Sequence, residues 1–304
     1  MDSFNAIPIF VAVADSAGFS RAARVLGISK SAVSKRITQL EQQLGSRLFY
    51  RSTRKLSLTE AGERYYQYAS QANRAAKQAE DAVSELQGEP KGLLKIQVPM
   101  TIGQMHLASF IPEFIDRYPE IKIDLVMDDR EINLIEQGFD LAIRADDLAD
   151  SNLIARLLVP LHSVVCVSPS FYQKHRERLN SPSQLADLNC ILYSYSNNAD
   201  VWLFNDSNGG EHKVKVAGNY RVNNSAALRD AVIAGMGAGR LPTFVAGAAI
   251  QKGELVALFQ DYTMPSKKLN AIYPERHYLP AKVRVFLDYI IGKLGDGSAY
   301  WDEF

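Results

Sequence analysis

The sequence predicts a multidomain α+β protein, in which a helical N-terminal part is joined by one long helix to an α/β C-terminal part. Three composition zones lead to this prediction. Short helical patterns and an alternating basic stretch fill residues 1–58, and a pattern without Gly or Pro runs over 63–87. After breaker residues at 88–92, strand-like and helix-like segments alternate from Leu93 onward. A length of 304 residues also exceeds that of one ordinary domain.

Positive charge is concentrated at the N-terminal end, although the whole chain carries 34 basic and 34 acidic residues. Residues 1–62 contain nine Lys or Arg and four Asp or Glu, so this segment has a net charge of +5 and the remainder −5. A compact basic end on an otherwise acidic protein is typical of a DNA-binding module.

Within residues 1–58 the pattern predicts three helices. The first begins near Asn5, with Pro8 in its first turn and a buried face of Ile7, Phe10, Val11 and Ala14. Ser20 is the expected N-cap of the second helix, and Gly27 its C-terminal end. Ser29 caps the third helix, which Gly45 ends, and this is the spacing of a helix-turn-helix.

The third helix has two different faces. Its expected core face carries Val33, Ile37, Leu40 and Leu44. The other face carries short or basic side chains that could reach base edges and phosphates: Lys30, Ser31, Ser34, Lys35 and Thr38.

Residues 48–58 alternate apolar and polar side chains around a basic tip, which predicts a two-stranded wing. Arg51, Arg54 and Lys55 of this wing could contact phosphates or the minor groove. Two capped helices with surface cations also occur in proteins that bind no DNA, so the pattern alone leaves both interpretations open.

The string FSRAARVLGISKSAVSKRITQLEQQLGSRLFYRSTRKLSLTEAG, residues 19–62, resembles the signature of the LysR-type transcriptional regulators. The resemblance extends through the chain. The residues of the wing and of the later segments are similar to those of the large CrgA-like subgroup. It implies that Lys30, Ser31 and Lys35 face the major groove, that Ser34 contacts phosphate and that Arg54 enters the minor groove. The full expected DNA-binding set is Ser29, Lys30, Ser31, Ser34, Lys35, Arg36, Arg51, Arg54 and Lys55.

This chain departs from the family at two positions of the third helix. The family often has Gln or Pro at position 30 and Arg at position 35, whereas this chain has Lys30 and Lys35. Lysine cannot make the planar bidentate contact that arginine makes, so the base preference of the family does not carry over directly.

Residues 59–88 predict a linker helix with Thr59 as N-cap. Its apolar stripe consists of Tyr65, Tyr66, Ala69, Ala72, Ala76, Ala79, Val83 and Leu86. The stripe could pack against its own domain or against a second copy of the chain. The resemblance implies an antiparallel helix pair in a homodimer, commonly assembled into a homotetramer.

Residues 89–295 resemble the family's effector domain, which has two lobes like those of periplasmic solute-binding proteins. Lobe I is expected at about 92–161 and 267–295, lobe II at about 162–266, and 296–304 as a frayed tail. Ligands bind beyond the carboxyl ends of strands in such sheets. The expected effector-binding residues are Pro99, Met100, Thr101, Ile102, Met127, Arg144, Tyr195, Asn223, Asn224 and Ser225.

Several of these residues have a second interpretation. Thr101 and Ser225 could be simple N-caps, and Arg144 could form an interlobe salt bridge instead of binding an effector carboxylate. If Arg144 binds the effector, the effector is anionic. Cys166 and Cys190 fit buried, inert thiols better than a peroxide-sensing pair.

The competing function classes are an enzyme and a stand-alone solute-binding protein with the same bilobal fold. The sequence has no HExxH, P-loop or GxSxG motif, no metal-ligand spacing among its five histidines and no dinucleotide-binding loop, so we expect neither enzyme activity nor a cofactor. The start of the chain has no signal-peptide pattern, which favours the cytoplasm. The expected partners are therefore promoter DNA, a small-molecule effector and, in activation, RNA polymerase.

Overall fold

The computed structural model describes residues 3–51, 56–86, 89–130, 132–145, 153–196, 198–274, 279–295 and 297–304. The chain divides into two compact units: Met1–Glu89 with Ile135–Gly138, and Pro90–Leu134 with Phe139–Phe304. None of the helices in the described ranges combines the length and apolar character that a membrane crossing requires.

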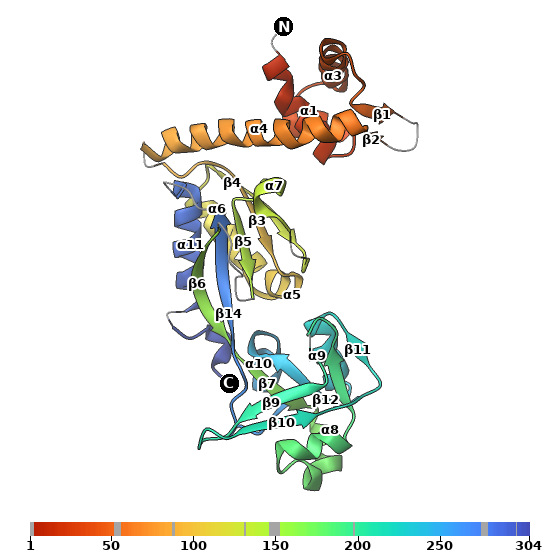
Figure 1. The fold of residues 1–304 in the computed structure, drawn as a ribbon. Helices are drawn as coiled ribbons and strands as arrows, with labels where there is room; N and C mark the ends of the chain where they lie inside the picture. The colour runs from red at the N-terminus through yellow and green to blue at the C-terminus, as the bar shows by residue number, and fades with distance from the viewer. Residues whose placement is uncertain are drawn as a thin grey trace. The chain divides into compact units, whose positions relative to one another are not determined.

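The first unit contains the expected helices and wing (Figure 1). Strands β1 and β2 pair antiparallel, with Tyr50 opposite Ser57. The elements in chain order are η1 Ser3–Ala6, α1 Ile7–Asp15, α2 Phe19–Leu26, α3 Lys30–Leu44, β1 Phe49–Arg51, β2 Leu56–Leu58 and α4 Glu60–Leu86.

The turn between α2 and α3 follows from its capping residues. Gly27 and Gly45 both have φ of 64°, the left-handed conformation that glycine adopts without a steric penalty, and each ends a helix. The hydroxyl of Ser29 accepts a hydrogen bond from the Ala32 N–H and starts α3. The prediction of Ser20 as N-cap is wrong, because α2 begins two residues earlier, with Gly18 as N-cap and its carbonyl accepting from the Ala22 N–H.

The core of the first unit confirms the predicted buried face of α3 except at its end. Val33, Ile37 and Leu40 are completely buried, but Leu44 is 42% exposed. Glu41 is buried in its place, because its carboxylate accepts hydrogen bonds from the backbone N–H groups of Leu48 and Phe49 at the start of the wing. The apolar period of 3.6 residues could not reveal a buried acid.

The beginning of α4 packs against the same core. The Thr59 hydroxyl accepts from the Gly62 N–H, so Thr59 is the N-cap as predicted. Ala69 is buried and Tyr65 packs at its side, while the Tyr66 hydroxyl donates to Asp15 of α1. Further along, Ala76 and Ala79 are exposed. Among the stripe residues whose side chains the structure describes, those in the first turns of α4 therefore pack on their own domain, whereas Ala76 and Ala79 do not.

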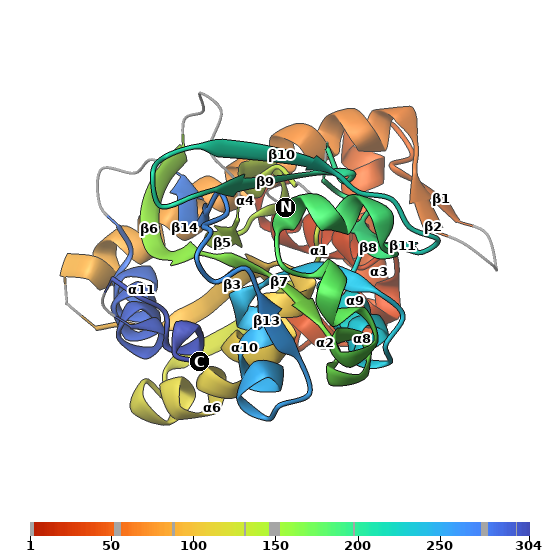
Figure 2. The ribbon, with the colours of Figure 1, turned by 90° about the horizontal axis from the view of Figure 1, so that it is seen from below.

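The second unit contains two five-stranded sheets. The first, in the order β4-β3-β5-β14-β6, is covered on one face by α6 and α11, which pack against each other (Figures 1 and 2). We call it lobe I. Its elements are β3 Gly92–Val98, α5 Met100–Ile102, the π-helical η2 Gly103–Leu107, α6 Ala108–Arg117, β4 Ile121–Met127, β5 Leu141–Arg144, β6 Leu153–Leu161, β14 Lys267–Pro274, α11 Ala281–Leu294 and η5 Tyr300–Asp302. Helix α7 Leu134–Gln137 follows β4 in the chain, and all of it except Leu134 belongs to the first unit.

The second sheet, in the order β11-β8-β12-β7-β13, forms lobe II. Helices α9 and α10 cover one of its faces, and α8 with the β9–β10 hairpin covers the other. Its elements are β7 Ser163–Val167, α8 Pro169–His175, η3 Arg176–Arg178, η4 Pro182–Asp187, β8 Cys190–Tyr193, β9 Val201–Asn205, β10 Glu211–Lys215, β11 Arg221–Val222, α9 Ser225–Ile233, β12 Ala238–Pro242, α10 Thr243–Gln251 and β13 Val256–Leu258.

The expected frayed C-terminal tail is wrong for the described residues 297–304. Ala299 and Trp301 are buried in the core of lobe I, and η5 lies beside α10, near the C-terminus marked in Figure 2. The segment looks polar and glycine-rich when read alone. Burial of Trp301 and Ala299 contributes to ordering the segment, because a large aromatic side chain removes a large apolar area from water.

Candidate nucleic-acid interface and small-molecule cavity

The exposed face of α3 is the candidate nucleic-acid interface. Lys30, Ser31 and Lys35 are exposed, whereas Val33 and Ile37, on the opposite side of the helix, are completely buried. Because the core holds one side of α3, the other side is free to enter a groove. The helix begins at the Ser29 cap, where the Ser29 and Ser31 hydroxyls lie 2.9 Å apart.

Of the remaining predicted DNA-binding residues, the structure describes Ser34 and Arg36 in full. Ser34 is half-buried beside the exposed face, and Arg36 is exposed on the flank of α3. Arg51 ends strand β1, and nothing is described of its side chain. Arg54 and Lys55 lie outside the described residues, so their role in the wing stays a prediction.

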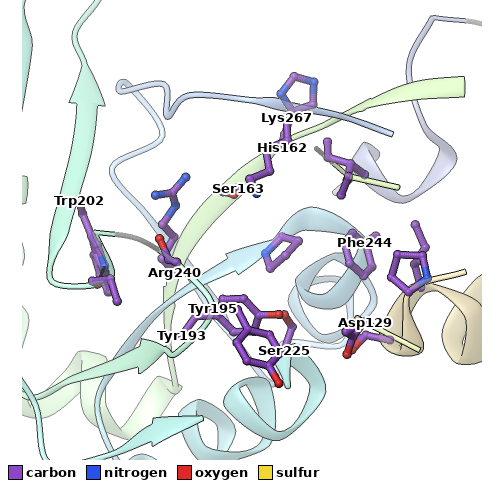
Figure 3. A pocket seen from close by; sticks show the side chains of 18 of the residues that line it. Asp129, His162, Ser163, Tyr193, Tyr195, Trp202, Ser225, Arg240, Phe244 and Lys267 are labelled. Carbon is purple, nitrogen blue, oxygen red and sulfur yellow. Dashed lines mark hydrogen bonds between the residues drawn. The ribbon is translucent and has the colours of Figure 1, made fainter. Parts of the chain in front are cut away.

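A cavity of about 230 Å³ opens in the second unit, between lobe I and lobe II (Figure 3). Lobe I contributes the segment after β3, the Asp129 loop and the end of β6, and lobe II contributes the ends of β8 and β12. The residues that line it are Pro99, Thr101, Ile102, Asp129, Ala145, Leu161, His162, Ser163, Ile191, Tyr193, Tyr195, Ser196, Asn198, Ala199, Trp202, Ser225, Arg240, Pro242, Phe244 and Lys267.

The structure brings half of the predicted effector-binding residues to this cavity. Pro99, Thr101, Ile102, Tyr195 and Ser225 line it. The capping alternative is wrong for Thr101 and Ser225, because the helix that follows Pro99 has no side-chain cap. The cap of α9 is the residue before Ser225, whose side-chain oxygen accepts from the N–H groups of Ala226 and Ala227.

The other five predicted residues are not among those that line the cavity. Met100 is exposed, with its N–H donating to Asp129, and Met127 packs beside Gly103 in lobe I. Arg144 donates to the Ile132 carbonyl at 2.7 Å, a contact within lobe I that replaces the interlobe salt bridge considered for it.

Asn223 and Asn224 lie next to the cavity and hydrogen-bond to two of its lining residues. The Asn223 amide donates to the Tyr195 hydroxyl at 2.9 Å. The amide of Asn224 donates to the Thr101 hydroxyl at 3.4 Å and so links lobe II to lobe I. Both residues therefore contact side chains that line the cavity.

A second link between the lobes passes through His106 of η2. Its Nε2–H donates to the Phe244 carbonyl at 2.8 Å, which leaves Nδ1 to accept from the Tyr300 hydroxyl. Burial lowers the pKa of His106, so the neutral ring that this arrangement needs is favoured. Phe244 lines the cavity, and the C-terminal segment thus connects to the cavity wall through one imidazole.

Reasoning from the sequence missed several cavity residues, of which Arg240 is the most informative. It lies in β12 between the buried Gly239 and Leu241 and projects into the cavity (Figure 3). Burial lowers the pKa of its guanidinium, which nevertheless stays charged at neutral pH. The feature of the sequence that could have identified it is an arginine within an apolar strand pattern, because a charged side chain is rarely buried without a partner or a ligand.

The two cysteines occupy β7 and β8 and are buried. Strand β12 lies between them, with Gly239 opposite Cys166 and Ala238 opposite Cys190. The two cysteines are therefore separated by two strand spacings of about 4.8 Å each. This separation exceeds roughly 7 Å, the largest distance between Cα atoms that a disulfide can bridge. Burial raises the pKa of each thiol to about 12, which favours the interpretation as inert thiols.

Comparisons with known proteins cover both units. The family described as "Bacterial regulatory helix-turn-helix protein, lysR family" matches residues 4–63, and "LysR substrate binding domain" matches residues 87–295. The chain is 32% identical to the probable HTH-type transcriptional regulator LtrA of Klebsiella pneumoniae, over 95% of this chain and 94% of that protein.

A second relative has also been solved as a structure. The chain is 33% identical to the HTH-type transcriptional regulator CrgA of Neisseria meningitidis serogroup C (strain 8013), over 95% of this chain and 96% of that protein. The structure of CrgA, a LysR-type transcriptional regulator from Neisseria meningitidis, aligns with a TM-score of 0.62 at 32% identity, covering 96% of this chain and 99% of that chain.

Proposed function

Since this chain belongs to the LysR family of transcriptional regulators, we propose that α3 lies in the major groove of promoter DNA, with the wing along the adjacent backbone. The chain is a LysR-type regulator with a DNA-binding helix-turn-helix and an effector-binding domain. The observation that carries the proposal is the two-faced α3: Val33, Ile37 and Leu40 are buried while Lys30, Ser31 and Lys35 are exposed.

The effector enters the cavity between the lobes and changes the equilibrium between two arrangements of the effector domain. The bonds from Asn224 to Thr101 and from His106 to the Phe244 carbonyl span the two lobes and adjoin the cavity, so ligand contacts can strengthen or break them. A ligand shifts this equilibrium only by its difference in affinity for the two arrangements. Two cations, Arg240 and Lys267, line the cavity and favour an anionic effector.

The exposed apolar part of α4 pairs with the same helix of a second copy and makes a homodimer, which can assemble further into a homotetramer. Ala76 and Ala79 are exposed, and small side chains permit close approach of two helices. The pairing would bring two copies of α3 onto a two-fold operator. We place this protein in the cytoplasm with the chromosome and propose a regulator, not an enzyme, that contacts RNA polymerase when it activates.

DNA binding is tested by footprinting the full-length protein on the DNA upstream of its own coding region and of neighbouring genes. We expect a protected site bound roughly 10³-fold or more tightly than random duplex, with affinity that falls steeply as salt rises. Equal affinity for promoter and random DNA at moderate salt, with and without candidate metabolites, would contradict the proposal.

Dimerisation is tested by sedimentation equilibrium of the double variant A76E/A79E. Each substitution adds a negative charge to the apolar face of α4, so the variant should sediment as a smaller species than the wild type. The matched control is Gln67→Glu, which adds a charge to the opposite, exposed side of α4. A double variant with the mass of the wild type would exclude this helix face as the interface.

A further inference from the structure

The volume of the cavity suits one small ring or a short chain. Its volume is about 230 Å³. An engineered protein cavity of about 150 Å³ holds one benzene molecule. One six-membered ring with a single substituent therefore fits between the lobes.

Several aromatic side chains line the cavity. Tyr193 and Tyr195, at the end of β8, lie with ring centroids 6.1 Å apart in an edge-to-face arrangement. Trp202 of β9 and Phe244 of α10 complete the set. The indole N–H of Trp202 already donates to the Ala199 carbonyl, so the ring offers the ligand mainly an apolar surface. Aromatic rings in such settings favour another flat ring, stacked or edge-on.

The guanidinium of Arg240 has five N–H groups that can donate hydrogen bonds to a ligand in this cavity. No hydrogen bond or ion pair connects its guanidinium to any other residue in the described part of the chain. Among the described lining residues, Asp129 is the only carboxylate, and it already accepts from the Met100 N–H. In the view of Figure 3, Asp129 lies apart from Arg240 and Trp202.

A half-buried guanidinium without a partner is costly, and the cost is offset when an anion binds. Arginine presents parallel N–H groups that match the two oxygens of a carboxylate. Lys267 and His162 also line the cavity, and Lys267 adds a second positive charge. The electrostatics of the cavity thus favour one negative group, located near Arg240.

We propose that the effector is a small aromatic carboxylate whose carboxylate binds Arg240 and whose ring lies against Tyr193 and Tyr195. The proposal rests on the proposed function, because it names the ligand class of the same cavity. The hydroxyls of Ser163 and Ser225 and the Asp129 carboxylate remain available for polar substituents on the ring.

The test uses the full-length protein and a panel of probes: benzoate, 4-hydroxybenzoate, salicylate and phenylacetate, with benzamide and cyclohexanecarboxylate as comparisons. Binding is measured by isothermal titration calorimetry. We expect at least one aromatic acid to bind about tenfold or more tightly than the neutral benzamide and the non-aromatic ring. The variant Arg240→Gln should lower the affinity for this acid by about 10- to 100-fold and leave the affinity for benzamide unchanged.

The control variant is Arg221→Gln, which makes the same change at an exposed arginine of lobe II that does not line the cavity. Its affinity for the acid should lie within about twofold of the wild-type affinity. Proper folding of both variants is checked by their unfolding midpoints. Failure of every aromatic acid to bind, equal binding of cyclohexanecarboxylate, or unchanged binding in Arg240→Gln would each overturn the proposal.

Operator footprinting of the same preparations separates this proposal from the proposed function. A protein that protects its promoter but binds none of the aromatic acids overturns the ligand class alone. A protein that binds an aromatic acid through Arg240 but protects no promoter supports the ligand class and contradicts the regulatory role.

Discussion

The carboxylate of Glu41, near the end of α3, accepts a hydrogen bond from the backbone N–H of Leu48 at 2.9 Å. The same oxygen accepts from the Phe49 N–H at 3.3 Å, so one buried side chain connects the candidate recognition helix to the first strand of the wing. A carboxylate that satisfies two buried N–H groups stabilises both ends of this connection.

Glu41→Ala should therefore lower the free energy of unfolding of the DNA-binding unit by about 2–3 kcal/mol, because it leaves two buried N–H groups without an acceptor. Urea denaturation followed by far-UV circular dichroism measures this. The control Glu41→Gln retains a carbonyl oxygen and should lose less than half as much. Equal losses in the two variants would show that charge, not hydrogen bonding, matters at this position.

Removing a cation from the exposed face of α3 should weaken operator binding without affecting folding. Lys35→Ala, and separately Arg54→Ala in the wing, should each cost about 1–3 kcal/mol of operator affinity. If Lys35 contacts a phosphate, its variant should also have a salt slope smaller by about one unit. Lys252→Ala, at an exposed lysine of lobe II, is the control. Wild-type affinity in both single variants would remove these assignments.

The buried His106 should make the second unit less stable in weak acid. Its folded-state pKa lies below the ordinary value of 6.5, because burial penalises the charged ring. The unfolded chain then binds more protons, so this contribution to stability is complete above about pH 6.5 and decreases as the pH falls from there toward the folded pKa. Each unit of pKa difference corresponds to about 1.4 kcal/mol.

The measurement is urea unfolding at pH 7.5, 6.5 and 5.5, followed by tryptophan fluorescence, since both Trp residues lie in the second unit. His106→Gln should be less stable at pH 7.5 but should show a flatter pH dependence. A slope that survives in His106→Gln would assign the pH dependence to another group.

A buried ion pair connects α11 to the sheet of lobe I. Lys282 Nζ lies 3.3 Å from Asp140 and donates to the Leu93 carbonyl, while Asp140 accepts from the Lys95 N–H. Asp140→Asn leaves a buried ammonium without its counter-charge and should cost about 3–5 kcal/mol. Thermal unfolding measures this. The exposed pair of Arg156 and Asp288 is the comparison: Asp288→Asn should cost less than about 1 kcal/mol.

The cysteines should be unreactive in the native protein. Burial raises the pKa of both thiols to about 12, so almost no thiolate is present at pH 8. A thiol reagent should modify neither residue until denaturant is added, and peroxide should leave operator affinity unchanged. Rapid modification of the native protein would show that lobe II itself opens locally and exposes β7 or β8.

Much of the first unit could be predicted from the residues alone. The caps at Gly27, Ser29 and Gly45 and the buried triad of α3 depend on contacts within a few residues, which periodicity and capping rules describe. The exceptions are instructive. Leu44 is exposed because the core ends before the last turn of α3, and Glu41 is buried because the wing folds back over it.

The cavity could be predicted only in part. The positions after β3 and before α9 were found because strand ends and helix starts can be located in the sequence. Arg240 and Phe244 were missed, because a side chain inside a strand or helix can point toward either of two sides. Which side faces the cavity depends on how β12 and α10 pack against β7 and β8.

The sequence by itself determined the alternation of helices and strands, the basic N-terminal end, the capped turn before α3 and the family, because each depends on local pattern and composition. Only the tertiary structure decided which side chains share the cavity and that the C-terminal Trp301 is buried. The physical reason is that these contacts join residues far apart in the chain, such as Thr101 with Asn224 and His106 with Tyr300, and no local period encodes such pairs.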